Sequence, residues 1–191
     1  RWVQNAGDAC LTFEEYFDQA LALWREYAAG KNCMNLTVWQ FGTLYPKTKH
    51  YTLTAVNTCT GKYRDSAPVC KGNRGMVAIG ANGNVFPCHQ MSGYYERQGD
   101  VLGNVKKTPL KDLLSEGKYL DEVCTTLGTL RKKNQTCGNC SHFEQCNGGC
   151  RAVALALTGD KLGIDPSKCL FWKNGYADRI ASALPDYSTN I

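Results

Sequence analysis

CGNCSHFEQCNGGC, residues 137–150, places four of the chain's eleven cysteines in one short stretch. The spacing is C-x2-C-x5-C-x3-C, formed by Cys137, Cys140, Cys146 and Cys150. Two thiolates separated by two residues can bind one metal centre from a single turn, and sets of four suit either Zn²⁺ or an iron–sulfur cluster. The glycine pair at 148–149 lets backbone N–H groups approach negatively charged sulfur, a feature that zinc sites also use. The stretch therefore predicts one closed thiolate site, or two sites that share these cysteines.

The number and context of the cysteines favour metal over disulfides. Eleven is odd, so a fully disulfide-bonded chain would leave one thiol over. The N-terminus has no basic segment followed by an apolar one, and no apolar run approaches the roughly 20 residues of a membrane-spanning helix. We therefore expect a soluble, cytoplasmic protein with reduced thiols and no membrane partner.

The charge balance gives no reason to expect a nucleic-acid partner. The formal net charge of +5 comes from 22 Lys and Arg against 17 Asp and Glu. The basic residues are spread widely and cluster only briefly at 106–107 and 131–133. So dilute an excess is typical of a solvated surface.

The periodicity of the first third predicts a helix followed by strands. Residues 12–29 have the pattern of an amphipathic helix that opens with a capping box of Thr12 and Glu15. Alternation predicts a strand at 35–41 and a weaker one at 51–56. A helix and a strand of this kind are what the end of a partial α/β barrel would supply. Because the chain also begins without an initiator Met, we expect a piece of a longer protein.

The remainder predicts small elements between the cysteines. A strand at 75–80, an Asn-Gly turn and a strand at 84–87 form a hairpin. Pro87 lacks an N–H and ends the pairing just before Cys88. Further helical patterns lie at 108–133, 151–158 and 171–184. Together these elements predict an α+β fold.

The order of all the clustered cysteines resembles a known family. Cys70 is followed by twelve residues, Gly83, four residues and Cys88, and Cys169 comes after the 137–150 stretch. This order resembles the SPASM domain, the C-terminal extension of many radical S-adenosylmethionine enzymes. The resemblance covers about residues 57–175, and the segment Leu102-Gly103-Asn104-Val105 is similar to the family as well. Seven cysteines and a glycine at matching spacing are far more specific than an isolated CxxC pair.

The resemblance implies two [4Fe–4S] clusters with interleaved ligands. Auxiliary cluster I would be held by Cys70, Cys88 and Cys150. Cys59 is its implied fourth ligand, and without that ligand the open iron would bind substrate. Auxiliary cluster II would be held by Cys137, Cys140, Cys146 and Cys169.

The resemblance also implies a domain order. Residues 1–56 would be the tail of a partial barrel, residues 57–175 the SPASM domain, and residues 176–191 a C-terminal helix and tail. The SPASM domain would be a small cysteine-rich α+β domain, with a β-hairpin and several short helices around two metal clusters.

The activity that the resemblance implies is modification of a peptide or protein, for example thioether or carbon–carbon cross-linking of a ribosomal precursor. The clusters would transfer electrons or anchor the substrate, and a flavodoxin- or ferredoxin-type donor is an implied partner. The C-x3-C-x2-C loop that binds S-adenosylmethionine does not occur in this sequence, so we expect the cofactor in a missing N-terminal part and no catalytic residue here. Sulfatase maturases of the family carry an acidic residue where this chain has His89, which disfavours that branch. Maturation of a peptide-derived quinone cofactor stays open.

Two other functions are compatible with the residues alone. One is a stand-alone iron–sulfur module for electron transfer or binding, without catalysis. The other is a structural zinc domain, since tetrathiolate sites also suit Zn²⁺.

The residues outside the motif have ordinary structural interpretations. Three further cysteines lack partners at metal spacing and are expected to be small buried hydrophobes: Cys10, Cys33 and Cys124. His89 and His142 adjoin proposed ligands and are expected to be surface or hydrogen-bonding residues. The helical aromatic residues are expected in the core: Trp24, Tyr27, Phe171 and Trp172. For Tyr94 and Tyr95, packing is a simpler interpretation than a substrate path.

Overall fold

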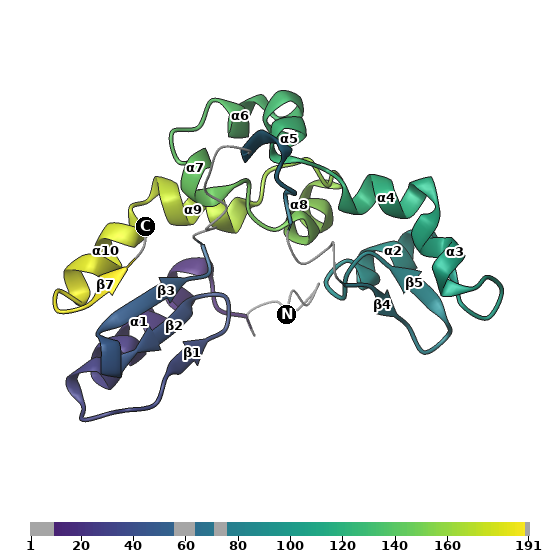
Figure 1. The fold of residues 1–191 in the computed structure, drawn as a ribbon. Helices are drawn as coiled ribbons and strands as arrows, with labels where there is room; N and C mark the ends of the chain where they lie inside the picture. Colours follow the sequence, from purple (N-terminus) through teal and green to yellow (C-terminus); the bar gives the residue numbers. More distant parts are fainter. Residues whose placement is uncertain (1–9, 56–63, 71–75, 190–191) are drawn as a thin grey trace. The chain divides into compact units, whose positions relative to one another are not determined.

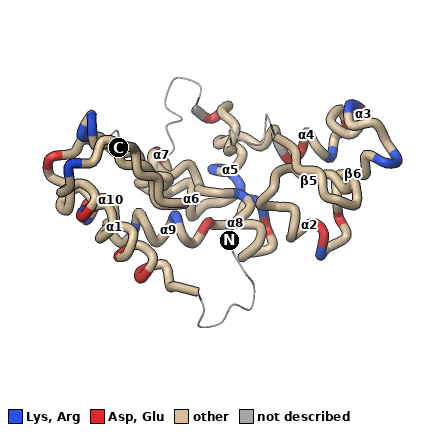
Figure 2. Tube along the Cα trace, turned by 90° about the horizontal axis from the view of Figure 1, so that it is seen from below, with Lys and Arg blue, Asp and Glu red and all other residues tan. Residues whose placement is uncertain are grey.

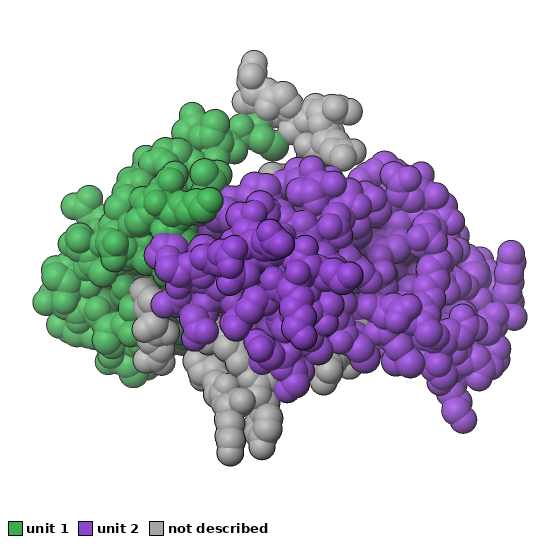
Figure 3. All heavy atoms as spheres, turned by 90° about the horizontal axis from the view of Figure 1, so that it is seen from above, with its two compact units in different colours: residues 1–57, 170–191 green, residues 58–169 purple. Residues whose placement is uncertain are grey.

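A computed structural model describes residues 10–55, 64–70 and 76–189 of the 191-residue chain. The chain divides into two compact units, coloured separately in Figure 3. Unit 1 comprises residues 1–57 and 170–191, and unit 2 comprises residues 58–169. Both contain helices and short strands, so the expected α+β class is confirmed (Figure 1).

Unit 1 begins with helix α1 (Phe13–Ala29), as the sequence predicts. Both bonds of the capping box are present: the Glu15 N–H donates to Thr12 Oγ1 at 3.2 Å, and the Thr12 N–H donates to Glu15 Oε2 at 2.8 Å. The helix buries Phe17 and Trp24, which are 1% and 0% exposed. The Phe17 ring lies 4.2 Å from that of Tyr176, so an aromatic core joins the two ends of the chain.

The sheet of unit 1 has the strand order β1-β2-β3-β7. Its first three strands form an antiparallel meander, and the last strand runs parallel to β3. The strands are β1 (Leu36–Val38), β2 (Gly42–Tyr45), β3 (His50–Leu53) and β7 (Ser188–Thr189), with a 3-10 turn η2 (Pro46–Thr48) before β3. The prediction for 35–41 was wrong in extent, because the chain turns at Gln40, whose φ is +61°. The second strand of the hairpin was not predicted.

The second sheet lies in unit 2 and has the order β4-β5-β6. Its strands are β4 (Ala78–Ile79), β5 (Asn84–Phe86) and β6 (Gly103–Asn104). The predicted Asn-Gly turn is confirmed, with Gly83 at φ +90° and a Gly80 N–H donating to the Asn84 carbonyl at 2.8 Å. Strand β6 was missed because two residues are too few for a periodic pattern.

Short helices make up most of the rest of unit 2. They are α2 (Ser92–Gln98), α3 (Leu110–Ser115), α4 (Gly117–Val123), α5 (Leu127–Lys133), α6 (Gln135–Gly138), α7 (Phe143–Cys146) and α8 (Arg151–Thr158), with a 3-10 turn η3 (Arg64–Ser66) ahead of them. The pattern at 108–133 was predicted as continuous, but the backbone is extended at Glu116 and again at Thr126. The helix predicted at 151–158 is confirmed.

The last helical region consists of two helices. Helix α9 (Pro166–Lys173) begins in unit 2, and α10 (Tyr176–Ala183) belongs to unit 1. The prediction of a single helix at 171–184 was wrong, because Gly175 adopts φ +67° and separates α9 from α10. Within unit 1, Arg179 of α10 pairs with Glu14 at 2.8 Å and Asp18 at 2.6 Å on α1.

The charged residues are distributed along the whole trace, in keeping with the modest net charge. Figure 2 shows basic and acidic residues interspersed along the trace rather than gathered on one element. In the ranges that the structure describes, no helix has the length and apolar character needed to cross a membrane.

Candidate metal centres

The seven cysteines of the predicted motif are withdrawn from solvent to different degrees. Cys137 is buried, with 7% of its surface exposed. The other six are half-buried: Cys70, Cys88, Cys140, Cys146, Cys150 and Cys169. Cys59 lies outside the described residues. The remaining three cysteines are exposed, so the prediction that Cys10, Cys33 and Cys124 are buried was wrong. For Cys124 the reason is that α4 ends just before it.

One group of interacting thiols consists of Cys70, Cys88 and Cys150. Burial raises the pKa of Cys88, and the thiols of Cys150 and Cys70 raise it further. Burial also raises the pKa of Cys150, with Asp165 and Cys70 adding to the shift. Both effects disfavour a thiolate in the metal-free chain, as expected where several negative charges would share a site of low polarity.

A second group consists of Cys137, Cys140, Cys146 and Cys169. Burial raises the pKa of Cys137, and the thiols of Cys169 and Cys140 act in the same direction. Burial raises the pKa of Cys146 to about 12, again with a contribution from Cys169. The thiols named among the causes of these four shifts belong in each case to the same group as the shifted cysteine.

The two groups also lie against different apolar clusters. Cys88 and Cys150 pack against the cluster of Phe86, Met91, Tyr95, Ala152 and Leu155. Cys137 belongs to the cluster of Val69, Leu127, Leu130 and Phe143, with Cys140 packed against it. Each group therefore has its own low-polarity environment, in which a bound cluster would be shielded from water.

Backbone N–H groups point at three of these sulfurs. Those of Met91 and Gln90 lower the pKa of Cys88, which burial raises. Cys150 stands at the N-terminus of α8, where the N–H groups of Val153 and Ala152 act on its sulfur. Cys146 ends α7 and its sulfur receives the Gly148 N–H. Hydrogen bonds of this kind stabilise cluster-bound thiolates and tune their reduction potentials.

The glycine pair makes the turn between the two groups possible. Asn147, Gly148 and Gly149 have φ values of +50°, +77° and +75°, so three consecutive residues occupy the left-handed region. This turn separates Cys146, in the second group, from Cys150, in the first. A side chain at Gly149 would meet Asp165 Oδ2 at 2.5 Å, so only glycine fits the available space.

Charged side chains are buried between the two groups. Arg151 is 5% exposed and Asp165 is 2% exposed. Arg151 is near enough to lower the pKa of Cys137, which burial raises, and Lys168 does the same for Cys146. A positive charge in this position would offset part of the negative charge that thiolates and clusters carry.

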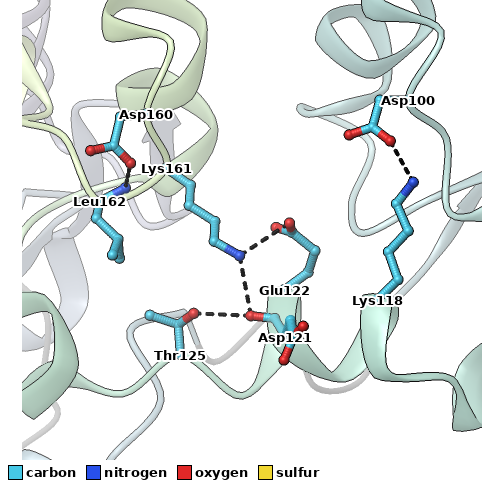
Figure 4. Close-up of polar contacts among 8 residues, drawn as sticks. All are labelled: Asp100, Lys118, Asp121, Glu122, Thr125, Asp160, Lys161 and Leu162. Atoms are coloured by element: carbon cyan, nitrogen blue, oxygen red, sulfur yellow. Dashed lines mark hydrogen bonds and ion pairs between the residues drawn. The ribbon is translucent and has the colours of Figure 1, made fainter.

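A neighbouring network fixes the loop that leads to Asp165. Lys161 Nζ donates to Glu122 Oε1 at 3.1 Å and to the Asp121 carbonyl at 3.2 Å, as the close-up shows (Figure 4). The Asn134 side chain donates to the Leu162 carbonyl at 2.8 Å and accepts the Cys137 N–H at 3.1 Å. The loop is therefore anchored both to α4 and to the turn that carries Cys137.

The donor chemistry of these thiols is compatible with an iron–sulfur group. The donors are sulfur atoms beside apolar clusters, with backbone N–H groups directed at three of them. Cubane clusters take four thiolates each, and this donor chemistry suits them.

Comparison with known families agrees with the chemistry of these donors. Residues 70–147 match the family described as "SPASM: Iron-sulfur cluster-binding domain". This segment belongs to the SPASM family. The SPASM match includes five of the motif cysteines, while Cys150 and Cys169 follow it. No solved structure gives a significant match.

Several curated proteins are similar to part of this chain, among them heme synthases and peptide cyclases. An "AdoMet-dependent heme synthase" of Nitratidesulfovibrio vulgaris is 31% identical over 97 residues, which covers 51% of this chain and 23% of that protein. A second protein of that name, from Methanosarcina barkeri, is 30% identical over 111 residues, 58% and 28% of the two chains. A "PqqA peptide cyclase" of Methylobacterium sp. is 27% identical over 143 residues, 75% of this chain and 31% of that protein. The chain thus spans less than a third of the length of these relatives.

Two buried charged residues near the thiols were not singled out in the sequence. Arg151 entered only as the first residue of the helix predicted at 151–158, and Asp165 was not considered. The pair Asp165-Pro166 does match the usual start of a helix, an N-cap followed by Pro at the first position, and could have predicted α9. The burial of both charges could not be predicted, because it depends on segments distant in sequence.

Proposed function

We propose that unit 2 holds two [4Fe–4S] clusters with interleaved ligands. Cys70, Cys88 and Cys150, with Cys59, would hold auxiliary cluster I. The ligands of auxiliary cluster II would be Cys137, Cys140, Cys146 and Cys169. The observation that carries this proposal is that thiols act on one another in two sets beside two separate apolar clusters: Cys70 and Cys150 raise the pKa of Cys88, whereas Cys140 and Cys169 raise that of Cys137.

The proposed iron–sulfur domain spans residues 57–175. Its limits lie close to those of unit 2, and the SPASM match falls within it. Residues 1–56 would be the tail of a partial barrel, and residues 176–191 a C-terminal helix and tail, which pack with that segment in unit 1. The part that binds S-adenosylmethionine would belong to a preceding segment.

We infer that the whole protein is a radical S-adenosylmethionine enzyme that modifies a peptide, for example by forming a carbon–carbon or thioether cross-link. When bound, the auxiliary clusters would supply electron transfer or an iron site that anchors the substrate. The peptide cyclase alignment supports this choice, since it extends over 143 residues, well beyond the SPASM segment. The chain's own residues would bind the clusters, exclude water from them and direct N–H groups at their sulfurs. A flavodoxin- or ferredoxin-type protein would be the electron donor, and the enzyme would work in the cytoplasm.

A second candidate substrate is a tetrapyrrole. Two heme synthases are 31% and 30% identical to this chain, against 27% for the peptide cyclase of Methylobacterium sp., although over shorter segments. Binding of a tetrapyrrole and of a precursor peptide to the reconstituted protein, followed by absorption spectroscopy and calorimetry, distinguishes the two. Saturable binding of the tetrapyrrole alone would contradict the peptide assignment.

Elemental analysis tests the clusters. After anaerobic reconstitution we expect about eight irons and about eight sulfides per chain, on the basis of four thiolates for each cubane cluster. Two zincs and no sulfide would instead support a structural zinc domain. A chain that binds both clusters but is never joined to a C-x3-C-x2-C segment in its native protein would be the stand-alone module.

The assignment of individual ligands is tested by replacing Cys169. Cys169→Ala should remove the electron paramagnetic resonance signal of cluster II and leave that of cluster I. The matched control is Cys124→Ala, since Cys124 is exposed and belongs to neither group. Loss of the cluster I signal alone in Cys169→Ala would overturn the interleaved assignment.

A further inference from the structure

Two buried charged residues, Arg151 and Asp165, lie close in sequence to a cysteine of each thiol group, and neither is a proposed ligand. Arg151 follows Cys150 directly and opens α8, while Asp165 directly precedes α9, the helix of Cys169. Burying an ionised side chain is costly unless it is hydrogen-bonded, so the partners of each charge show what it stabilises.

The Arg151 guanidinium is bonded entirely to backbone carbonyls. Nη1 donates to the carbonyls of Lys161 and Gly163, each at 2.9 Å. Nη2 donates to the Gly148 carbonyl, and Nε has no partner among the described residues. The N–H of that same Gly148 is directed at the sulfur of Cys146. Arg151, which adjoins Cys150, therefore bonds two backbone segments next to the second thiol group. These are Gly148, close to Cys146, and the loop 161–163 that leads to the helix of Cys169.

The Asp165 carboxylate makes the reverse connection. Oδ2 accepts the Cys150 N–H at 2.8 Å, and Oδ1 accepts the Lys168 N–H at 3.2 Å, which caps α9. The carboxylate also lies directly against Gly149, where there is no room for a side chain. Asp165 thus reaches from the Cys169 side to the backbone of Cys150.

We propose that Arg151 and Asp165 are positioning residues that act crosswise. Arg151 is adjacent to Cys150 of the first thiol group but positions the backbone around the second group. Asp165 precedes the helix of Cys169, in the second group, but positions the backbone of Cys150 in the first. This inference rests on the proposed division of the seven cysteines between two clusters. Charge-assisted hydrogen bonds in a site of low polarity are strong and directional, which suits them to fixing backbone segments before iron arrives. The planar guanidinium spreads its N–H donors over a rigid fork that reaches three separate carbonyls, whereas a lysine ammonium carries its three donors on one nitrogen atom.

The crosswise arrangement predicts opposite losses in two conservative variants. Arg151→Lys keeps the positive charge but cannot span the Gly148 carbonyl and the 161–163 loop together, so cluster II should be lost. In Asp165→Asn the amide keeps the helix cap, since Asn caps helices as well as Asp does. With the amide oxygen on the cap, the N–H₂ group faces the Cys150 N–H. Two donors then face each other, the bond that holds the Cys150 backbone is lost, and cluster I should be lost with it.

The experiment compares these variants with the intact protein after anaerobic reconstitution. We expect each variant to retain about four of about eight irons, with the resonance signal of one cluster missing and that of the other unchanged. Matched controls are Arg179→Lys, a surface arginine of unit 1, and Asp160→Asn, which removes the same charge from the same loop while an amide oxygen can still accept the Leu162 N–H. Both controls should keep both clusters.

Alkylation of the metal-free protein, followed by mass spectrometry, gives a second readout that needs no iron. Cys169 should react several-fold faster in Arg151→Lys, and Cys150 several-fold faster in Asp165→Asn, with circular dichroism unchanged. Full retention of both clusters and unchanged alkylation would overturn the inference, and so would equal loss of both clusters or a general loss of structure. If the unaltered protein takes up no iron, the proposed function fails, while the alkylation pattern still decides whether the two residues act crosswise.

Discussion

Replacing Gly149 by Ala should destabilise unit 2 strongly, for two separable reasons. The residue has φ +75°, and left-handed backbone costs an alanine about 1–2 kcal/mol. The new methyl group would also lie 2.5 Å from Asp165 Oδ2, 2.7 Å from its Cβ and 2.7 Å from Lys168 Cγ. Overpacking of this kind costs about 1–3 kcal/mol. We therefore expect the free energy of unfolding to fall by about 2–5 kcal/mol.

A second glycine isolates the steric contribution. Gly159 has nearly the same φ, +74°, but an added side chain there would meet nothing within 4 Å. Gly159→Ala should therefore cost only the conformational part, about 1–2 kcal/mol. Urea unfolding of the metal-free variants, followed by circular dichroism, measures both values. If Gly149→Ala loses no more stability than Gly159→Ala, the close packing of Asp165 against the glycine pair is refuted.

Two further predictions concern other parts of the chain. Lys161→Met leaves the Glu122 carboxylate, whose side chain is only 14% exposed, without its cation. The free energy of unfolding should fall by about 1–2 kcal/mol, which is less than for a fully buried pair because this pair is partly exposed. Lys118→Met breaks an ion pair whose side chains are 44% and 64% exposed, so the free energy of unfolding should fall by less than about 1 kcal/mol. If urea unfolding shows equal losses for Lys161→Met and Lys118→Met, this reasoning is contradicted. Thr12→Ala should destabilise α1 by about 1 kcal/mol through loss of the cap. Hydrogen bonds from the Thr12 N–H and hydroxyl lower the pKa of Glu15, so this stabilisation is present above the ordinary pKa of a glutamate and lost as the pH falls through the lowered value. Thermal unfolding should therefore show a smaller difference between wild type and Thr12→Ala in acid, and a constant difference would exclude a contribution from the bond between the Thr12 hydroxyl and the Glu15 carboxylate.

Local features were predictable wherever neighbouring residues decide the structure. The capping box at Thr12 and Glu15 and the Asn-Gly turn before β5 depend on contacts within four residues, and both are confirmed. The interruptions at Glu116 and Gly175 were missed, because an apolar pattern can continue across a break in a helix. The three exposed cysteines were misjudged for a related reason, since burial depends on what packs against a residue and not on its type.

The sequence by itself determined the set of thiols and their order, because the spacing of Cys70, Gly83, Cys88 and the 137–150 stretch is a property of the chain alone. It also determined the α+β class and, through that spacing, the similarity to the SPASM family. Only the tertiary structure decided which thiols influence one another, since this depends on three consecutive residues with positive φ between Cys146 and Cys150. It alone brought Asp165 to the Cys150 N–H and Arg151 to the carbonyls of Lys161 and Gly163, because these bonds join segments 10 to 15 residues apart through a fold that no local pattern encodes.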